Sequence, residues 1–379
     1  MSLVAITPAE FPWLPYARYS FSLGVRAGRR AWLSGHTAST LDPATGRVAV
    51  VGDMAEQAET AWDKIERIAE TGAFSLADVT RVVEYCTPEG LARHAEAAAV
   101  RERRLAGSGA APAVCVVPVA ALLRPAALLE VEVTLGGGND DTVHLPSLTP
   151  LDERGEVIAP GDLGGQVRAV LERAAALLAD EGLTLADVVK TVECTMPATR
   201  SAYRATGEVR RELLGPAFPA ATGVLMPTVP HAKRGAMITL DVIASRSPKQ
   251  VVNPGWDAYK RLTFSPGVRA GDLVFLSGTT ALDWNRGEVV HKGDVAAQAE
   301  YVLEQLDLIV KAAGGRGVAD LVKTVEFVDP KAMEGYRGVG AVRERVLSRP
   351  YPASTGVLVE ALLQPDYLIE ICSYAAIEA

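Results

Sequence analysis

The chain has 379 residues, of which 49% are hydrophobic and 22% charged, and a formal net charge of −8. This is the composition of an ordinary globular protein with two or three domains. The acidic balance, with no basic run longer than residues 101–104, excludes a nucleic-acid-binding surface, because phosphate contacts need clustered lysine and arginine. The four cysteines have no CxxC spacing and suit reduced, packed thiols better than disulfides or a zinc site.

The first residues of the chain carry neither the basic segment nor the apolar core of a signal peptide. The longest apolar stretch, Val114 to Leu123, is interrupted by Pro118 and is too short to cross a bilayer. We therefore expect a cytoplasmic protein that does not bind membranes.

One pattern of elements occurs three times along the chain. Each copy has a Gly-Asp pair, at Gly52, Gly161 and Gly293, followed by apolar residues three and four apart, which predicts an amphipathic helix. A Leu-Ala-Asp-like turn and a β-branched strand come next. These strands are Arg81–Tyr85, Lys190–Cys194 and Lys323–Phe327. A second helix follows, clearest at 203–214 and 336–347, and two apolar strands end each copy, as at Ala353–Leu362 and Tyr367–Ser373.

This order predicts an α/β (α+β) unit in which a mixed sheet carries two helices on one face. Segments 136–141 and 245–255 are typical of linkers. We predict three tandem domains, at 1–138, 139–248 and 249–379. The middle domain has no sequence for the first strand of the N-terminal hairpin and should be truncated. The bare face of each sheet needs a partner.

The repeated segments together resemble the RidA/YjgF superfamily of imine and enamine deaminases over nearly the whole chain. The likeness is carried by Val25–Gly35, Val268–Gly278 and Tyr351–Val357, with the Gly-Asp helix start and the Leu-Ala-Asp turn. It implies a chorismate-mutase-like fold and homotrimers with ligand clefts between neighbours. Three fused copies then imply a covalent pseudo-trimer whose sheets form a pseudo-threefold barrel. Whether this pseudo-trimer is a monomer or a homodimer stays open.

The arginine that anchors the substrate carboxylate in these deaminases has no counterpart in this chain. In the family it follows Pro-Ala at the start of a late strand, where its fork matches both carboxylate oxygens. The matching positions are occupied by Val114, Ala221 and Ser354. The anchor is absent from all three copies.

The family's water-positioning glutamate is matched by Glu130 and Glu370, and by Thr239 in the middle copy. Residues two apart share a strand face, so these carboxylates should turn toward the neighbouring domain. A carboxylate there is costly unless it is paired or catalytic. We predict Glu370 first, and Glu130, as general acid/base groups; a hydrogen-bonded interface acid is the alternative.

The remaining candidates are substrate-binding positions that the resemblance implies or that lie beside them. His36 would lie at a cleft mouth and could titrate near neutrality, a surface histidine being the alternative. Ser354 and Thr355 could supply hydroxyl donors in place of the guanidinium. Cys115 lies one position beyond the lost arginine, with a buried inert thiol as the alternative. The others are Ser34, Gly35, Phe21, Phe264, Ser277 and Gly278, and the Ser-Gly pair aligns with Pro146-Ser147 in the middle copy.

Three functions are compatible with these residues. The first is a cofactor-independent enzyme that acts on an imine, enamine or similar unsaturated small molecule, in a role that the Ala/Gly/Arg-rich composition places in bacterial specialised metabolism. The second is a chorismatase-like hydrolase with a late-strand glutamate, although chorismate needs cationic anchors and the late strands carry almost none. The third is a non-catalytic binding or scaffold protein. With no phosphate loop and no metal-ligand cluster, we expect no cofactor and no metal.

Overall fold

The computed structural model describes residues 1–136 and 140–378 of the chain. Residues 137–139 of the first predicted linker lie outside the described residues. No helix in the described part of the chain is both long and apolar enough to cross a bilayer.

The elements occur in three successive units, whose exact boundaries stay a prediction. The first unit contains β1 (Leu3–Ile6), β2 (Gly24–Ala27), β3 (Arg30–Leu33), β4 (Ser39–Leu41), β5 (Val48–Val50), α1 (Met54–Thr71), β6 (Val79–Cys86), α2 (Pro88–Ala92), α3 (His94–Leu105), β7 (Ala113–Pro118), β8 (Ala121–Leu122) and β9 (Leu129–Gly136). The second contains β10 (Thr142–His144), α4 (Leu163–Asp180), β11 (Val188–Thr195), α5 (Arg200–Tyr203), α6 (Gly207–Leu214), β12 (Ala220–Leu225) and β13 (Ile238–Ser245). The third contains β14 (Lys249–Val252), β15 (Gly267–Ala270), β16 (Leu273–Leu276), β17 (Thr279–Thr280), β18 (Leu282–Asp283), β19 (Glu288–Val289), α7 (Val295–Ala312), β20 (Leu321–Val328), α8 (Arg337–Val346), β21 (Ala353–Leu358) and β22 (Ile369–Ala376).

The three sheets share one topology. In the first unit the strand order is β1-β2-β3-β9-β6-β7, in which β6 and β7 are parallel and their other neighbours antiparallel. The third unit repeats this order as β14-β15-β16-β22-β20-β21, and β8 of the first unit adds to its end. The middle sheet has only β10-β13-β11-β12. Its strand β10 takes the place of β3, and among the described residues this sheet has no counterparts of β1 and β2.

The long helix of each unit covers the outer face of its sheet. Helix α1 begins with a capping box in which the Asp53 side chain accepts from the Glu56 N–H and the Glu56 side chain accepts from the Asp53 N–H. Its apolar stripe, including Trp62 and Ile65, packs with Val131 and Val133 of β9. Equivalent clusters lie under α4 and α7. The period of three and four residues therefore identified the buried face correctly.

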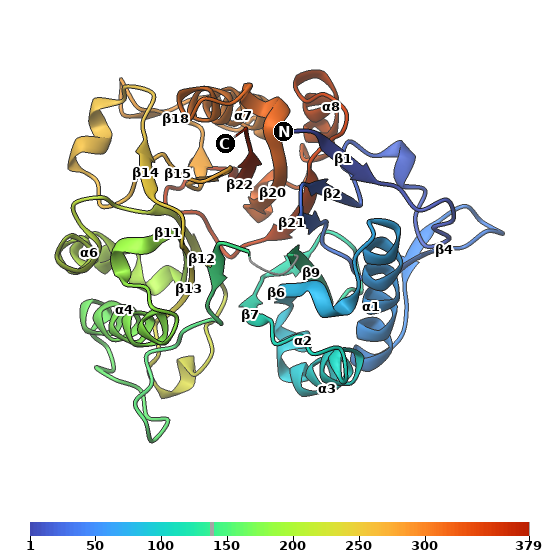
Figure 1. The fold of residues 1–379 in the computed structure, drawn as a ribbon, viewed down its shortest axis with the longest axis horizontal. Coiled ribbons are helices and arrows are strands. Elements are labelled where there is room, and N and C mark those ends of the chain that lie inside the picture. The colour runs from blue at the N-terminus through green and yellow to red at the C-terminus, as the bar shows by residue number, and fades with distance from the viewer. Residues whose placement is uncertain (137–139, 379) are drawn as a thin grey trace.

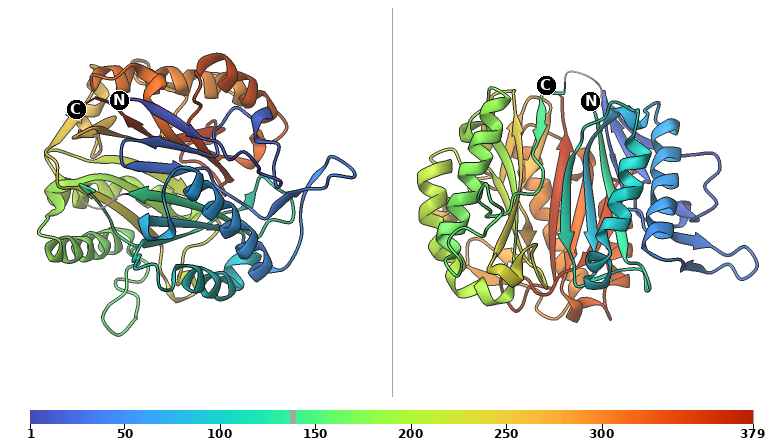
Figure 2. Two further views of the ribbon diagram at one scale, coloured as in Figure 1. Left: turned by 45° about the vertical axis from the view of Figure 1, so that its right-hand side comes forward. Right: turned by 90° about the horizontal axis from the view of Figure 1, so that it is seen from below.

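The inner faces of the three sheets pack on one another. One buried cluster contains residues from all three units, among them Val83, Cys194, Val325 and Phe327. Figure 1 shows the helices at the periphery and the strands turned to the middle. The chain ends lie close together, because the N-terminal ammonium pairs with Glu378 at 2.9 Å, and the β4–β5 hairpin projects from the body (Figure 2). Each sheet thus finds in its neighbours the partner that its bare face requires; a closed barrel stays a prediction.

Candidate active site between the second and third units

Glu370 lies on β22 and faces the second unit. Its carboxyl group is buried, and only 4% of the residue is exposed. The backbone N–H of Gly223, on β12 of the second unit, donates to it, and the Lys190 ammonium of β11 is near enough to act on it electrostatically. Burial nevertheless outweighs both contacts and raises the pKa of Glu370 to about 8. The side chain is therefore an acid that keeps its proton at neutral pH.

Gly278 makes room for this carboxyl group. A Cβ atom at this position would lie 1.9 Å from Glu370 Oε1, so no side chain fits beside the glutamate. In the same way, a Cβ atom added at Gly35 would lie 2.0 Å from Glu130 Oε1. In the middle unit the position is held by Ser147, as predicted, and its hydroxyl donates to Asp241 at 2.5 Å because the strand there carries Thr239 instead of glutamate. The two units that carry the late-strand glutamate therefore have glycine at the facing position, and the unit that carries threonine has serine there.

A cavity of about 530 Å³ opens over Glu370 between the second and third units. Its wall is partly aromatic, formed by Phe264, Trp284 and Tyr367, and the floor includes Gly223 and Gly278. Such a volume suits a small organic ligand. Of the predicted residues, the structure brings Glu370, Gly278 and Phe264 together here.

Four arginines also line this cavity: Arg204, Arg210, Arg211 and Arg261. Arg210 is neutralised by the buried carboxylate Glu193, to which its Nε donates at 2.8 Å. Among the described residues, none of the other three forms an ion pair. The cavity therefore has an excess of positive charge that can bind an anionic ligand. The late strands contribute no arginine to this cavity; its arginines come from the second helix region and from the segment between β14 and β15.

A strand glutamate paired with a helix arginine occurs in every unit. Glu84 pairs with Arg101 and Glu326 with Arg343, each at 2.6 Å, and the third pair is Glu193 with Arg210. This contact joins the second helix region to the middle of the sheet. The glutamates that recur in all copies are thus structural.

The cleft around Glu130 is more crowded. Burial raises the pKa of Glu130 to about 8, with Lys323, Glu132, Arg124 and Lys64 also acting on it. Lys323 is itself paired with Glu132 at 3.0 Å, and Thr355 donates to Glu132 at 2.7 Å.

Leu123 also lies closer over this cleft than its counterpart does over the other. A Cβ atom added at Gly356, in the cleft of Glu130, would lie 2.6 Å from Leu123. A Cβ atom added at Gly223, in the cleft of Glu370, would lie 3.6 Å from the equivalent Leu363. The cleft of Glu370 thus leaves more room over the neighbouring strand than the cleft of Glu130 does.

Two predicted site residues do not lie where the sequence placed them. His36 is not at a cleft mouth: it is buried in the ladder opposite Val131, and its burial, reinforced by Lys64 and Lys323, lowers its pKa to about 3. It therefore stays neutral. Cys115 belongs to the central cluster and contacts the carbonyl of Leu145, and burial raises its pKa to about 12. It is a packed thiol outside either cleft.

The serines of the Ser-Gly pairs connect neighbouring units. Ser34 donates to the carbonyl of Ser22 at 2.6 Å and accepts from the N–H of Ser354 at 2.8 Å. Ser277 makes the same pair of contacts with Ser265 and Ala221. Both hydroxyls are occupied by the backbone, so they position the clefts rather than bind substrate.

The other predicted positions also make contacts within the protein. Phe21 stacks on Tyr19 with the ring centroids 5.3 Å apart. Ser354 accepts from the Thr324 hydroxyl at 3.2 Å.

The cavity arginines and Lys190 are not among the site residues predicted from the sequence. Arg101, Arg210 and Arg343 occupy equivalent positions in the repeated second helix. Arg81, Lys190 and Lys323 occupy equivalent positions in a repeated strand whose other residues are nearly all buried. That recurrence was the available signal. No comparable signal marks Arg204 or Arg261, because arginines on helix and loop surfaces are common. Within the described residues no group of three His, Cys, Asp or Glu side chains is placed to hold a metal ion.

The fold has a counterpart among solved structures. A crystal structure of a chorismatase matches with a TM-score of 0.54 and 17% sequence identity, over 79% of this chain and 93% of that chain. This identity supports the shared fold alone. The fold is that of the chorismate-mutase-like class, and in this chain it places a buried glutamate beside a cavity between the second and third units.

The sequence comparisons identify the family. The model described as Endoribonuclease L-PSP matches residues 13–135 and 258–377. The 3-aminoacrylate deaminase RutC of Acinetobacter baylyi is 34% identical over 128 residues, which is 34% of this chain and 98% of the relative. RidA from an Antarctic Psychrobacter is 30% identical over 34% of this chain and 99% of its own, with a TM-score of 0.31. The chain belongs to the Endoribonuclease L-PSP family, that is, the RidA/YjgF superfamily.

Proposed function

We propose that this protein is a cofactor-independent enzyme that acts on an anionic, unsaturated small molecule in the cavity over Glu370. One observation carries the proposal: a buried carboxyl group, whose pKa burial raises to about 8, faces a cavity of about 530 Å³ that is also lined by three arginines without ion pairs among the described residues. An acid that keeps its proton near neutral pH is suited to protonate a substrate. Arg204, Arg211 and Arg261 take the place of the missing family arginine.

With an enamine, the chemistry starts by proton transfer from Glu370 to the β-carbon of the substrate. This gives an iminium ion and leaves Glu370 as a carboxylate. Water then adds to the iminium carbon and returns a proton to Glu370 as the carbon–oxygen bond forms. Loss of ammonia from the resulting carbinolamine gives the carbonyl product. The likeness to the deaminase RutC supports this reaction class.

A second candidate is the hydrolysis of a dicarboxylate enol ether such as chorismate. It is supported by the three unpaired arginines and by the similarity of the fold to a chorismatase. Glu370 would protonate the enol ether carbon, and water would add to the oxocarbenium ion and return a proton to Glu370. The resulting hemiketal would then break its bond to the ether oxygen and release an alcohol and a keto acid, so the same side chain serves both reactions.

The test compares ammonia release from freshly generated 2-aminoacrylate with consumption of chorismate. Wild type, Glu370→Gln and Glu130→Gln are assayed together, since the two glutamates occupy equivalent positions in different clefts. We expect one activity, about 100-fold or more lower in Glu370→Gln and nearly unchanged in Glu130→Gln. Loss in Glu130→Gln alone would place the reaction in the other cleft. With neither compound consumed, 2-aminoacrylate and chorismate are both ruled out as substrates, which leaves a different unsaturated substrate or a binding role.

A further inference from the structure

A second hollow, of about 450 Å³, adjoins the cavity of Glu370 on its outer side. The two share Arg211, Arg261 and Leu262, so a ligand can extend from one into the other. Lys260 and the ring of Phe218 complete much of the outer wall. We refer to it as the outer hollow.

The charge in the outer hollow is positive. Arg211, Lys260 and Arg261 line it, and no carboxylate does. Lys260 pairs with Asp257 at 2.6 Å, but their side chains are 76% and 87% exposed, so this pair is weak. Neither arginine forms an ion pair with any residue that the structure describes. Asp257 also acts electrostatically on Arg261, so three cations in and beside the outer hollow face one exposed carboxylate, which leaves an excess of positive charge in a chain whose net charge is −8.

The repeated architecture supplies an internal comparison. Because Arg210 and Arg343 make equivalent ion pairs, Arg211 corresponds to Glu344 in the helix beside the other cleft. The alignment of Phe264 with Phe21 likewise matches Lys260 with Ala17 and Arg261 with Arg18. Two of the three cations are therefore specific to this cleft, and the fold does not require them.

We propose that the outer hollow binds a phosphate group on the distal part of the substrate whose reactive part lies at Glu370. The proposal rests on the function proposed above. A phosphate monoester carries a charge of about −1.5 to −2 at neutral pH, which suits two or three cations, whereas one carboxylate would leave them under-neutralised. Guanidinium groups also bind phosphate through paired hydrogen bonds. The joined hollows have room for a substrate much larger than a three-carbon acid.

The experiment measures binding of inorganic pyrophosphate by calorimetry at fixed ionic strength. Arg261→Ala and Arg18→Ala are matched variants, since they remove the same side chain at equivalent positions of the two clefts. We expect Arg261→Ala to weaken binding about 10-fold or more, because a charge-assisted contact is lost. Arg211→Glu, which introduces the residue found beside the other cleft, should weaken it further. Arg18→Ala should bind like wild type.

Three outcomes would contradict the proposal that the outer hollow is a phosphate subsite. They are no pyrophosphate binding by wild type, equal weakening in Arg18→Ala, and binding of citrate as tight as that of pyrophosphate, which would show that phosphate is not preferred. Glu370→Gln should bind pyrophosphate like wild type. An inactive enzyme that still binds pyrophosphate through Arg261 would contradict the proposed reaction and leave the subsite intact.

Discussion

Glu370 is suited to act as an acid because burial opposes its ionisation. With its pKa raised to about 8, it is protonated over the neutral range and ionises only above it. If the protonated form starts the reaction, the rate should be constant below about pH 8 and fall about tenfold per pH unit above it. A profile of kcat/KM between pH 6 and 10 measures this. A rate that rises with pH would instead show the carboxylate acting as a base.

Gly278 offers a test that leaves the carboxyl group in the protein. A methyl group at this position would lie 1.9 Å from Glu370 Oε1 and would force the glutamate out of place. We expect Gly278→Ala to lower kcat at least about tenfold, as small displacements of catalytic groups do. Gly35→Ala makes the same change beside Glu130 and should leave kcat almost unaltered. Equal effects of the two substitutions would contradict the assignment of the active cleft.

At the scale of elements, an ion pair joins the long helix of each unit to its second helix. In the first and third units the long helix carries the acidic residue, whereas in the middle unit it carries the basic one. Glu59 on α1 pairs with Arg103 on α3, and Glu300 on α7 with Arg345 on α8. At the same register the middle unit has Arg168 on α4 and Glu212 on α6, 2.5 Å apart. Both charges have been exchanged together, so the contact matters rather than the identity of either residue.

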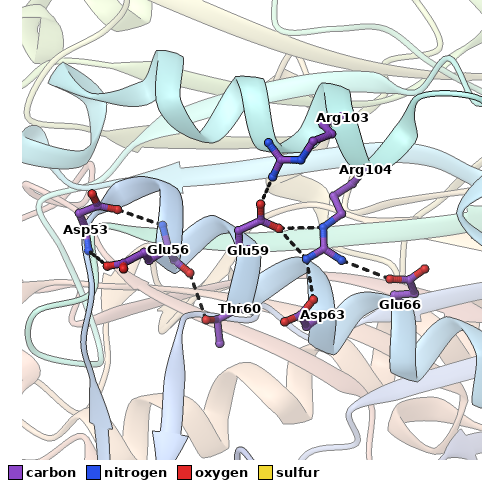
Figure 3. A network of polar contacts seen from close by, with 8 residues as sticks. All are labelled: Asp53, Glu56, Glu59, Thr60, Asp63, Glu66, Arg103 and Arg104. Atoms are coloured by element: carbon purple, nitrogen blue, oxygen red, sulfur yellow. Dashed lines mark hydrogen bonds and ion pairs between the residues drawn. The ribbon is translucent and has the colours of Figure 1, made fainter.

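Helix α1 is joined to α3 most extensively through Arg104. Figure 3 shows its guanidinium among Glu59, Asp63 and Glu66, at 2.5, 2.6 and 3.3 Å. Arg104→Ala should lower the free energy of unfolding by about 1 kcal/mol, because a network is worth more than one exposed pair. This loss of unfolding free energy should be smaller in 1 M salt, because salt screens the ion pairs. Chemical denaturation at low and high salt measures both; a salt-independent loss would point to packing of the side chain instead.

At the scale of the whole molecule, buried cations at one strand register lie at the contacts between units. Arg81 pairs with Asp241 between the first and second units at 3.2 Å, with both side chains 8% exposed. Lys323 pairs with Glu132 between the third and first, and Lys190 acts on Glu370 between the second and third. Each contact thus has its own cation, and the third contact opens onto the arginine-lined cavity.

Removing only one partner of the Arg81–Asp241 pair should strongly destabilise the protein. Asp241→Ala leaves a buried guanidinium without its partner, and we expect a loss of about 3–5 kcal/mol in the free energy of unfolding. The double variant Arg81→Met/Asp241→Leu removes both charges and should recover most of that loss. The midpoints of chemical denaturation of the single and the double variant measure this difference. A double variant as unstable as Asp241→Ala would show that the loss arises from packing rather than from the unpaired charge.

Local patterns were enough to predict the three units and the orientation of their faces. The spacing of apolar residues in each long helix and the alternation in β9 and β22 depend only on helix and strand periodicity, so Trp62, Val131 and Glu370 could be assigned a face from sequence. The family resemblance pointed to the late-strand glutamates in the same way.

Only the tertiary structure decided which cleft is open and what lines it. Arg204, Arg211 and Arg261 come from separate segments of two units, and no local pattern records that they meet. His36 was misplaced for the same reason: its sequence neighbours are those of a cleft residue, but burial beside Lys64 keeps it neutral. Burial, charge and cavity volume depend on contacts between units that are distant in sequence, and these contacts form only when the three sheets pack.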